Sequence, residues 1–185
     1  MPTNRNRSRG LLILMVMVIL MVGIGLGMWL AGSDKKVSES EGKSWRKNTE
    51  EVFLSIEGIE CIPDLSSYET GTLLDVIDGD SIRVAIDGEI FEVRYIGIDT
   101  PEYYSDQQQM AVAAKEENRK LVSNSPIYLF KDKSEIDQYD RLLRYVISND
   151  AFINLKMVKN GFAQVKAYPP DTSCQMVFNQ VIQNE

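Results

Sequence analysis

Two short acidic segments carry residues suited to binding a divalent cation. Residues 78–81 (Asp-Gly-Asp-Ser) separate two predicted strands, and residues 99–102 (Asp-Thr-Pro-Glu) follow the next predicted strand. If strands one and three lie close in a small barrel, the segments converge and bring Asp80, Asp99 and Glu102 into one pocket. Three carboxylates share a pocket cheaply only around a cation, and a hard divalent ion would suit them. Each segment alone also fits a plainer interpretation, a solvated turn and a helix start.

Two arginines suit a phosphate ligand. Arg94 lies off the apolar face of the third predicted strand, and Arg141 begins the fifth, after residues 137–140 (Asp-Gln-Tyr-Asp). Planar guanidinium groups match phosphate oxygens bidentately and remain charged at all relevant pH values. A lone arginine is more often part of a surface ion pair, so this interpretation depends on both arginines lying near the acidic segments.

The composition excludes several kinds of chemistry. The chain has no histidine and only two cysteines, which excludes Ser-His and Cys-His nucleophiles and His-ligated zinc. Acid–base work must come from carboxylates, Lys, Arg or Tyr, and an all-oxygen metal site favours calcium, magnesium or manganese. Beyond the first apolar run the chain carries 17 basic and 27 acidic residues, since three of its 20 Lys and Arg precede that run. The resulting net charge of −10 argues against a nucleic-acid partner.

The apolar periodicity predicts a mainly β fold with about three helices, of the α+β class. Strands are expected at residues 72–77, 81–86, 89–96, 127–130 and 142–147, and helices at 105–122, 153–159 and from 172 or 173 to the C-terminus. Asp87-Gly88 predicts a two-residue hairpin turn, Ser105 with Gln108 a helix capping box, and Gly161 a helix end. Five strands with an inserted helix predict a small Greek-key barrel.

The N-terminal part predicts a membrane anchor. The apolar run Leu11–Leu30 contains no charged residue, and about 20 residues span a bilayer. Arginines precede it, which places the N-terminus in the cytoplasm. We therefore expect a basic N-terminus at residues 1–10, one transmembrane helix at 11–31 in the lipid bilayer, a flexible linker at 32–51 and an extracytoplasmic domain at 52–185. The alternative is a cleaved signal peptide and a secreted domain, although signal h-regions are shorter, at about 7–15 residues.

The two cysteines lie on the outer side of the predicted span, where disulfides persist. Cys61 precedes the first predicted strand and Cys174 begins the last predicted helix. We expect a bridge between them, with two buried free thiols as the alternative.

Four segments together resemble the staphylococcal nuclease (thermonuclease) family. They are residues 71–84, 93–102, 137–146 and 154–163, in the family's order and spacing within about residues 71–174. The resemblance implies a five-stranded OB-fold barrel that hydrolyses phosphodiesters of DNA and RNA with calcium (Ca2+), leaving a 3′-phosphate and a 5′-hydroxyl. It also implies that Asp80 and Asp99 are carboxylate ligands of calcium, that Thr100 is a ligand through its carbonyl, and that Asp78 occupies an acidic position near the metal.

The resemblance assigns the catalytic and substrate-binding roles as well. Glu102 would orient or deprotonate the attacking water, while Arg94 and Arg141 would hold the phosphate and stabilise the transition state. Tyr168 matches, across an alignment gap, tyrosines that stack on a base. Asp140 departs from the usual glycine, and we expect a left-handed backbone there, which Asp tolerates better than most residues. Its charge would weaken the hold of Arg141 on phosphate.

The sequence therefore predicts a calcium-dependent endonuclease anchored at the cell surface, with DNA and RNA as substrates and no obligate protein partner evident. The alternative from another class is a non-catalytic OB-fold module that binds nucleic acid. The complete catalytic set favours the enzyme, because decay would be expected to remove at least one member: Asp80, Arg94, Asp99, Glu102 and Arg141. A purely structural membrane protein would leave the co-occurring motifs unexplained.

Overall fold

A computed structural model of the chain describes residues 51–123 and 126–183. Every described residue belongs to one unit, Lys43–Glu185. The predicted cytoplasmic segment, transmembrane anchor and almost all of the linker fall outside the described residues. Within the described ranges no helix has the length and apolar character needed to cross a membrane.

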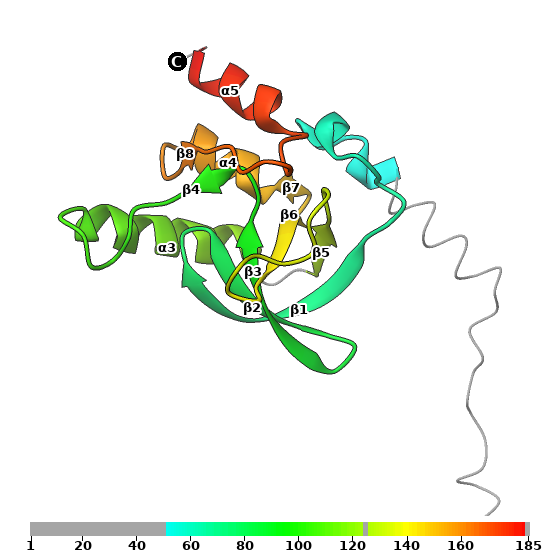
Figure 1. The fold of residues 1–185 in the computed structure, drawn as a ribbon, viewed down its shortest axis with the longest axis horizontal. Helices are drawn as coiled ribbons and strands as arrows, with labels where there is room; N and C mark the ends of the chain where they lie inside the picture. Colours follow the sequence, from blue (N-terminus) through cyan, green and yellow to red (C-terminus); the bar gives the residue numbers. More distant parts are fainter. Residues whose placement is uncertain (1–50, 124–125, 184–185) are drawn as a thin grey trace, which may run out of the picture. The chain divides into compact units, whose positions relative to one another are not determined.

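The described part consists of a β-barrel with helices packed around it (Figure 1). Its elements in chain order are η1 (Ile59–Cys61), β1 (Glu69–Asp78), β2 (Ser81–Ile86), β3 (Glu89–Tyr95), β4 (Ile98–Asp99), α3 (Gln108–Val122), β5 (Ile127–Phe130), β6 (Leu142–Ser148), β7 (Ala151–Phe152), α4 (Ile153–Lys159), β8 (Gln164–Val165) and α5 (Gln175–Gln183). The five main strands and three α-helices of the described part agree with the sequence-based expectation. The two-residue strands β4, β7 and β8 were not predicted, because so few residues show no periodicity.

The main sheet closes on itself into a barrel. Its strand order is β3-β2-β1-β5-β6-β7, and β3 also pairs with β6 in parallel. The β3–β6 ladder sets Val93 opposite Leu142 and Tyr95 opposite Arg144. Closure removes the free edges that an open sheet would leave and gives the five-stranded barrel of the OB type that the sequence predicted.

Turn chemistry fixes the ends of several elements. Asp87 and Gly88 both have positive φ, 50° and 89°, as a tight turn between β2 and β3 requires. The capping-box prediction was wrong. Helix α3 begins at Gln108 without a side-chain cap, since the Ser105 hydroxyl donates to the Glu102 carbonyl and accepts the Gln107 N–H. Ser105 therefore closes a turn that precedes the helix.

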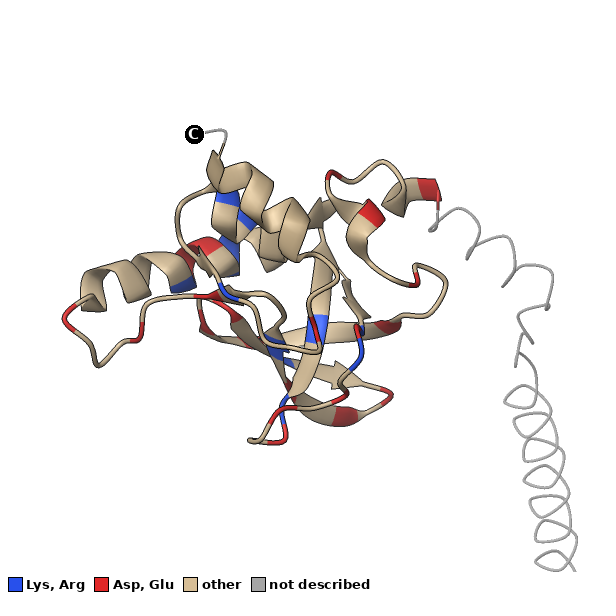
Figure 2. Ribbon diagram, turned by 45° about the horizontal axis from the view of Figure 1, so that its top comes forward, with Lys and Arg blue, Asp and Glu red and all other residues tan. Residues whose placement is uncertain are grey.

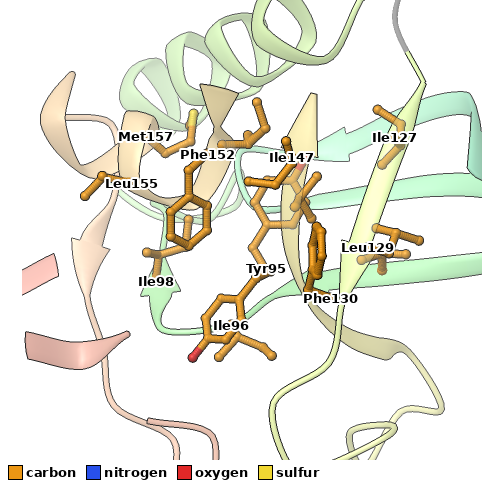
Figure 3. Close-up of a cluster of buried hydrophobic side chains, with 14 of the residues drawn as sticks. Tyr95, Ile96, Ile98, Ile127, Leu129, Phe130, Ile147, Phe152, Leu155 and Met157 are labelled. Carbon is orange, nitrogen blue, oxygen red and sulfur yellow. The ribbon is translucent and has the colours of Figure 1, made fainter. Parts of the chain in front are cut away.

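Two fully buried asparagines hold the core to the backbone near the acidic segments. Asn118 of α3 accepts the Tyr95 hydroxyl at 2.9 Å and donates to the Asp78 carbonyl at the end of β1. Asn154 of α4 accepts the Val146 N–H and donates to the Ile96 carbonyl. Apolar side chains from the strands and from α4 surround Tyr95 (Figure 3). Because buried amides satisfy these backbone groups, the ends of β1 and β3 have defined positions.

A buried arginine stabilises the long loop between β5 and β6 through hydrogen bonds. The Arg144 guanidinium is buried and donates to Glu69 of β1 at 2.6 Å and to the carboxylate and carbonyl of Glu135. Removing one partner of a buried ion pair leaves an uncompensated charge and is strongly destabilising. The Glu69–Arg144–Glu135 cluster thus fixes the loop that leads to Arg141.

The structure contains the disulfide that the sequence predicted. Cys61 at the end of η1 and Cys174 just before α5 are bonded, with Cα atoms 4.8 Å apart and a sequence separation of 113 residues. The start of α5 accordingly lies beside the first described segment (Figure 1). Phe178 of α5 packs so closely on Gly97 that a Cβ there would lie 2.7 Å from the ring. The bridge therefore holds α5 beside the β3–β4 junction.

We expect reduction of this disulfide to destabilise the domain. The loop-entropy model assigns about 4–5 kcal/mol to a loop of this length, as an upper limit. The thermal midpoint, followed by circular dichroism, should fall on adding reductant, whereas a Cys61→Ala/Cys174→Ala double variant should melt at the lower temperature with or without reductant. An unchanged midpoint in the wild-type protein would contradict a stabilising bridge.

Candidate active site

The two acidic segments meet, as the sequence predicted. Asp80 lies in the β1–β2 turn with 1% of its surface exposed, and its Oδ2 accepts the Thr100 N–H at 2.7 Å. The Tyr95 N–H donates to the Asp80 carbonyl at 2.9 Å. A Cβ at Gly79 would lie 2.7 Å from the Thr100 Cγ2 atom, so only glycine permits this approach. The expected proximity of β1 and β3 was wrong, because β2 lies between them, and the β2–β3 pairing brings the segments together.

Arg94 lies between the two acidic segments. It is on β3, opposite Ser81 of β2, and only 14% of its side chain is exposed. Its guanidinium forms ion pairs with Asp80 and with Asp99, the latter at 2.6 Å. Two carboxylates from different loops thus converge on the Arg94 guanidinium, and its positive charge offsets the cost of burying them.

The pKa values of Asp99 and Asp78 are shifted in opposite directions, because burial outweighs the neighbouring charges only at Asp78. Burial would raise the pKa of Asp99, but a hydrogen bond from Lys166 and the charge of Arg94 outweigh burial and lower that pKa below its ordinary value. Burial raises the pKa of Asp78, against the lowering effects of a hydrogen bond from Ser81 and the charge of Arg94. Asp99 is therefore held as an anion, whereas ionised Asp78 is penalised by its surroundings.

Arg141 is oriented by the loop that precedes it. Asp137 accepts the Arg141 backbone N–H at 3.1 Å and its Nε at 2.8 Å. Asp140 has φ of 61°, the left-handed conformation expected from the sequence. The Arg141 guanidinium also lies 5.4 Å from the centroid of the Tyr139 ring. Side chain and backbone together aim Arg141 towards the same space as Arg94.

A pocket of about 350 Å³ brings the two arginines together. Residues from β3, the loop before β6 and the segment before α5 line it, among them Arg94, Gly97, Asp137, Tyr139, Arg141 and Tyr168. Tyr168, predicted to stack on a base, is 43% exposed there. Paired guanidinium groups with aromatic walls suit a phosphate that carries a base.

Two residues in this region were missed by the sequence analysis. Tyr139 lines the pocket and stacks against Arg141. Lys166 donates to Asp99 at 2.8 Å and lies 5.3 Å from the centroid of the Tyr168 ring. Tyr139 lies in the segment carrying the resemblance, so its position was a usable signal. No local pattern distinguishes Lys166 from a surface lysine, because only the β4–β8 pairing brings it to Asp99.

Glu102 is not among the residues that line the arginine pocket. It is exposed, and within the described part of the chain its carboxylate forms no hydrogen bond or ion pair. Asp80 and Asp99, which pair with Arg94, are likewise absent from that lining. Thr100 faces Asp80 with its N–H.

The donor set is compatible with a hard cation. Asp80 and Asp99 supply carboxylate oxygens that already converge on one positive charge, and neither sulfur nor imidazole lies among them. Such oxygen donors are those that calcium accepts in proteins. Across the described residues, no group of three or more acidic, His or Cys side chains is arranged to hold a metal. A bound calcium would therefore depend on Asp80 and Asp99 completed by carbonyl and water oxygens.

The closed barrel, with two arginines and two carboxylates at one site, defines an OB-fold domain. Residues 92–184 match the family model described as "Staphylococcal nuclease homologue". The chain belongs to the staphylococcal nuclease family.

Several characterised relatives share this domain. The chain is similar to "Thermonuclease" of Staphylococcus intermedius, with 37% identity over 57% of this chain and 64% of that protein. It is 36% identical to "Thermonuclease" of Staphylococcus hyicus over 60% of this chain and 67% of that protein. It is also 36% identical to "Endonuclease YncB" of Bacillus subtilis over 55% of this chain and 50% of that protein. The matched part thus spans between half and about two thirds of these relatives.

Asp140 offers a test of the arginine site. Asp140→Asn keeps a side chain that tolerates positive φ and removes the charge beside Arg141, so affinity for a short oligonucleotide should rise about two- to fivefold. Asp140→Gly removes both the charge and the backbone strain and should also raise the unfolding free energy by up to about 1 kcal/mol. Fluorescence anisotropy and thermal denaturation measure the two effects. Weaker binding by Asp140→Asn would show that Asp140 supports Arg141.

Proposed function

We propose that this protein is a calcium-dependent endonuclease that hydrolyses phosphodiester bonds of DNA and RNA and leaves 3′-phosphate ends. One observation carries the proposal: Arg94 pairs with both acidic segments and lines the same pocket as Arg141. A phosphate in that pocket would lie beside the candidate metal ligands. The relatives named as thermonucleases and an endonuclease support the same activity.

Different residues of the chain would bind the metal ion and the phosphate. Asp80, Asp99 and the Thr100 carbonyl would hold calcium, which supplies Lewis acidity and offsets the charge of the phosphodiester. Arg94 and Arg141 bind the non-bridging oxygens and stabilise the charge that develops in the transition state more than that of the ground state.

The proton from the attacking water needs an acceptor. Glu102 is three residues after Asp99, on the loop that begins at the candidate metal ligands, and its exposed carboxylate has no competing partner in the described structure. A carboxylate is a workable base when one water is held in line with the phosphorus. Glu102 is therefore our candidate general base.

A non-catalytic module that binds nucleic acid is the second candidate. Two observations favour it: Glu102 lies outside the arginine pocket, and Arg94 is already paired with two carboxylates. Such a module would retain binding in the pocket without turnover.

Turnover should depend on calcium and on the acidic pair. With the full chain and a plasmid substrate, chelator should stop cleavage and added calcium should restore it, since two carboxylates with no cation repel the phosphate. Asp80→Ala and Asp99→Ala should abolish the rescue. Cleavage that continues undiminished in chelator would reject the metal assignment.

Glu102→Gln separates the enzyme from the binding module. If Glu102 takes a proton from water, this isosteric variant should lower turnover about 10²- to 10⁴-fold, with unchanged thermal stability and oligonucleotide affinity. Glu116→Gln, an exposed carboxylate on α3, is the matched control and should keep wild-type turnover. Normal turnover in Glu102→Gln would favour another base, and no turnover in the wild-type protein would favour the binding module.

We also propose that the protein acts at the cell surface, held in the membrane by residues 11–31, or else is secreted after signal cleavage. The support is the length of the run Leu11–Leu30, the arginines before it and the disulfide in the described domain. Carbonate washing of membranes discriminates the two forms. A soluble product that begins near Ser33 would identify a cleaved signal.

A further inference from the structure

Two adjacent tyrosines project from the loop between β4 and α3. Tyr103 is 51% exposed and Tyr104 is 98% exposed, the highest value among the large hydrophobic side chains of the described residues. Their ring centroids lie 5.2 Å apart with an interplanar angle of 85°. Neither ring is used by the site described above, and exposed adjacent aromatics indicate a surface that meets a partner.

A hydrogen-bonded turn carries the two tyrosines. The Ser105 N–H and hydroxyl both donate to the Glu102 carbonyl, at 3.2 Å and 2.6 Å, and close a turn whose central residues are the two tyrosines. The Gln107 N–H then donates to the Ser105 hydroxyl at 3.1 Å, which joins the turn to the start of α3. The turn that carries the two tyrosines thus begins at Glu102, the candidate base.

A second pocket, of about 380 Å³, lies behind these rings. Its wall consists of Ile77, Asp78, Pro101, Tyr103, Tyr104, Ala111, Val112 and Lys115. Asp78 precedes the acidic turn of the candidate active site, so the pocket borders that site. Ala111, Val112 and Lys115 share one face of α3, since residues three and four apart in a helix are neighbours. Lys115 forms no ion pair within the described ranges.

We propose that Tyr103, Tyr104 and the pocket behind them form a subsite that stacks one unpaired base of a nucleic-acid substrate, with Lys115 contacting the adjoining phosphate. The inference rests on the proposed function, because the subsite lies on the loop that carries Thr100 and Glu102. Aromatic side chains stack on bases of any sequence, and a nearby cation binds the backbone. A base can lie on this platform only when it has left a duplex, so the subsite selects single-stranded or melted substrate.

The charged residues around the two tyrosines favour a nucleic-acid base over a lipid surface as their partner. The loop carries Glu102 and Asp106, and Lys115 is the one basic residue among those that line the pocket. Binding to anionic membranes uses clusters of several basic residues near the surface. A neutral base on the rings, with one phosphate reaching Lys115, fits this arrangement.

Steady-state kinetics of the full chain test the subsite. For single-stranded oligothymidylate, Tyr103→Ala/Tyr104→Ala should raise KM about 5- to 150-fold, the range for loss of one stacked base, and leave kcat within about twofold. KM for a duplex of equal length should change less. Tyr103→Phe/Tyr104→Phe retains the rings and should restore most of the affinity. Ile90→Ala, another exposed apolar residue on β3, should match wild type.

A binding measurement tests the subsite independently of catalysis. Tyr104→Trp should show fluorescence quenching on titration with oligothymidylate in chelator, with the wild-type protein as the control for Trp29 and Trp45. Quenching without any cleavage by the wild-type protein would leave the subsite standing and reject the endonuclease. Cleavage with unchanged KM in the alanine pair would reject the subsite and leave the endonuclease standing.

Two other results would overturn the proposal. Loss of a dimer in the alanine pair, seen by sedimentation, would make the rings an interface between two copies. A blue shift of Tyr104→Trp fluorescence with phosphatidylserine vesicles, without quenching by oligothymidylate, would assign the rings to a lipid surface.

Discussion

The buried carboxylate of Asp80 is the constraint on which the site depends. With 1% of its surface exposed, it needs a hydrogen-bond donor and a counter-charge. The Thr100 N–H supplies the first and Arg94 the second. Gly79 leaves the room for Thr100 to approach. The path of the chain from β3 to α3 therefore follows from satisfying one charge, and the loop that carries Glu102 begins at that contact.

The acidic character of the domain does not exclude an anionic substrate, because two oriented arginines line the candidate pocket. Acidic and basic positions are interspersed over the described elements (Figure 2), rather than separated into opposite faces. Arg94 and Arg141 each have a carboxylate partner that orients them. In this arrangement, binding of an anion would depend on the fixed orientation of the two arginines more than on long-range electrostatic attraction. Long-range attraction would be screened by salt at physiological ionic strength.

Local patterns were sufficient to predict most of the main elements, because each has a strong period or a turn residue that the backbone requires. Strands β2 and β5 and helix α4 match their predicted bounds, and Asp87 and Gly88 adopt the positive φ that their turn predicts. The positive φ of Asp140 was expected from the resemblance, because a glycine is usual at that position. The start of α3 was misplaced because Ser105 had two possible partners. Lys166 and the closing β3–β6 pairing could not be predicted, since both depend on segments far apart in sequence. The resemblance gave Arg94 its role, but only the structure showed that it pairs with both carboxylates.

The Cys61–Cys174 bond also changes how the domain carries mechanical load and damage. The bond closes a covalent ring that contains every strand of the described structure, together with α3 and α4. Tension applied between the two ends of the chain passes through the sulfur atoms and cannot extend any strand of the barrel. A single peptide cleavage inside the ring leaves both fragments joined. A domain cleaved once within this ring would thus remain one covalently joined molecule.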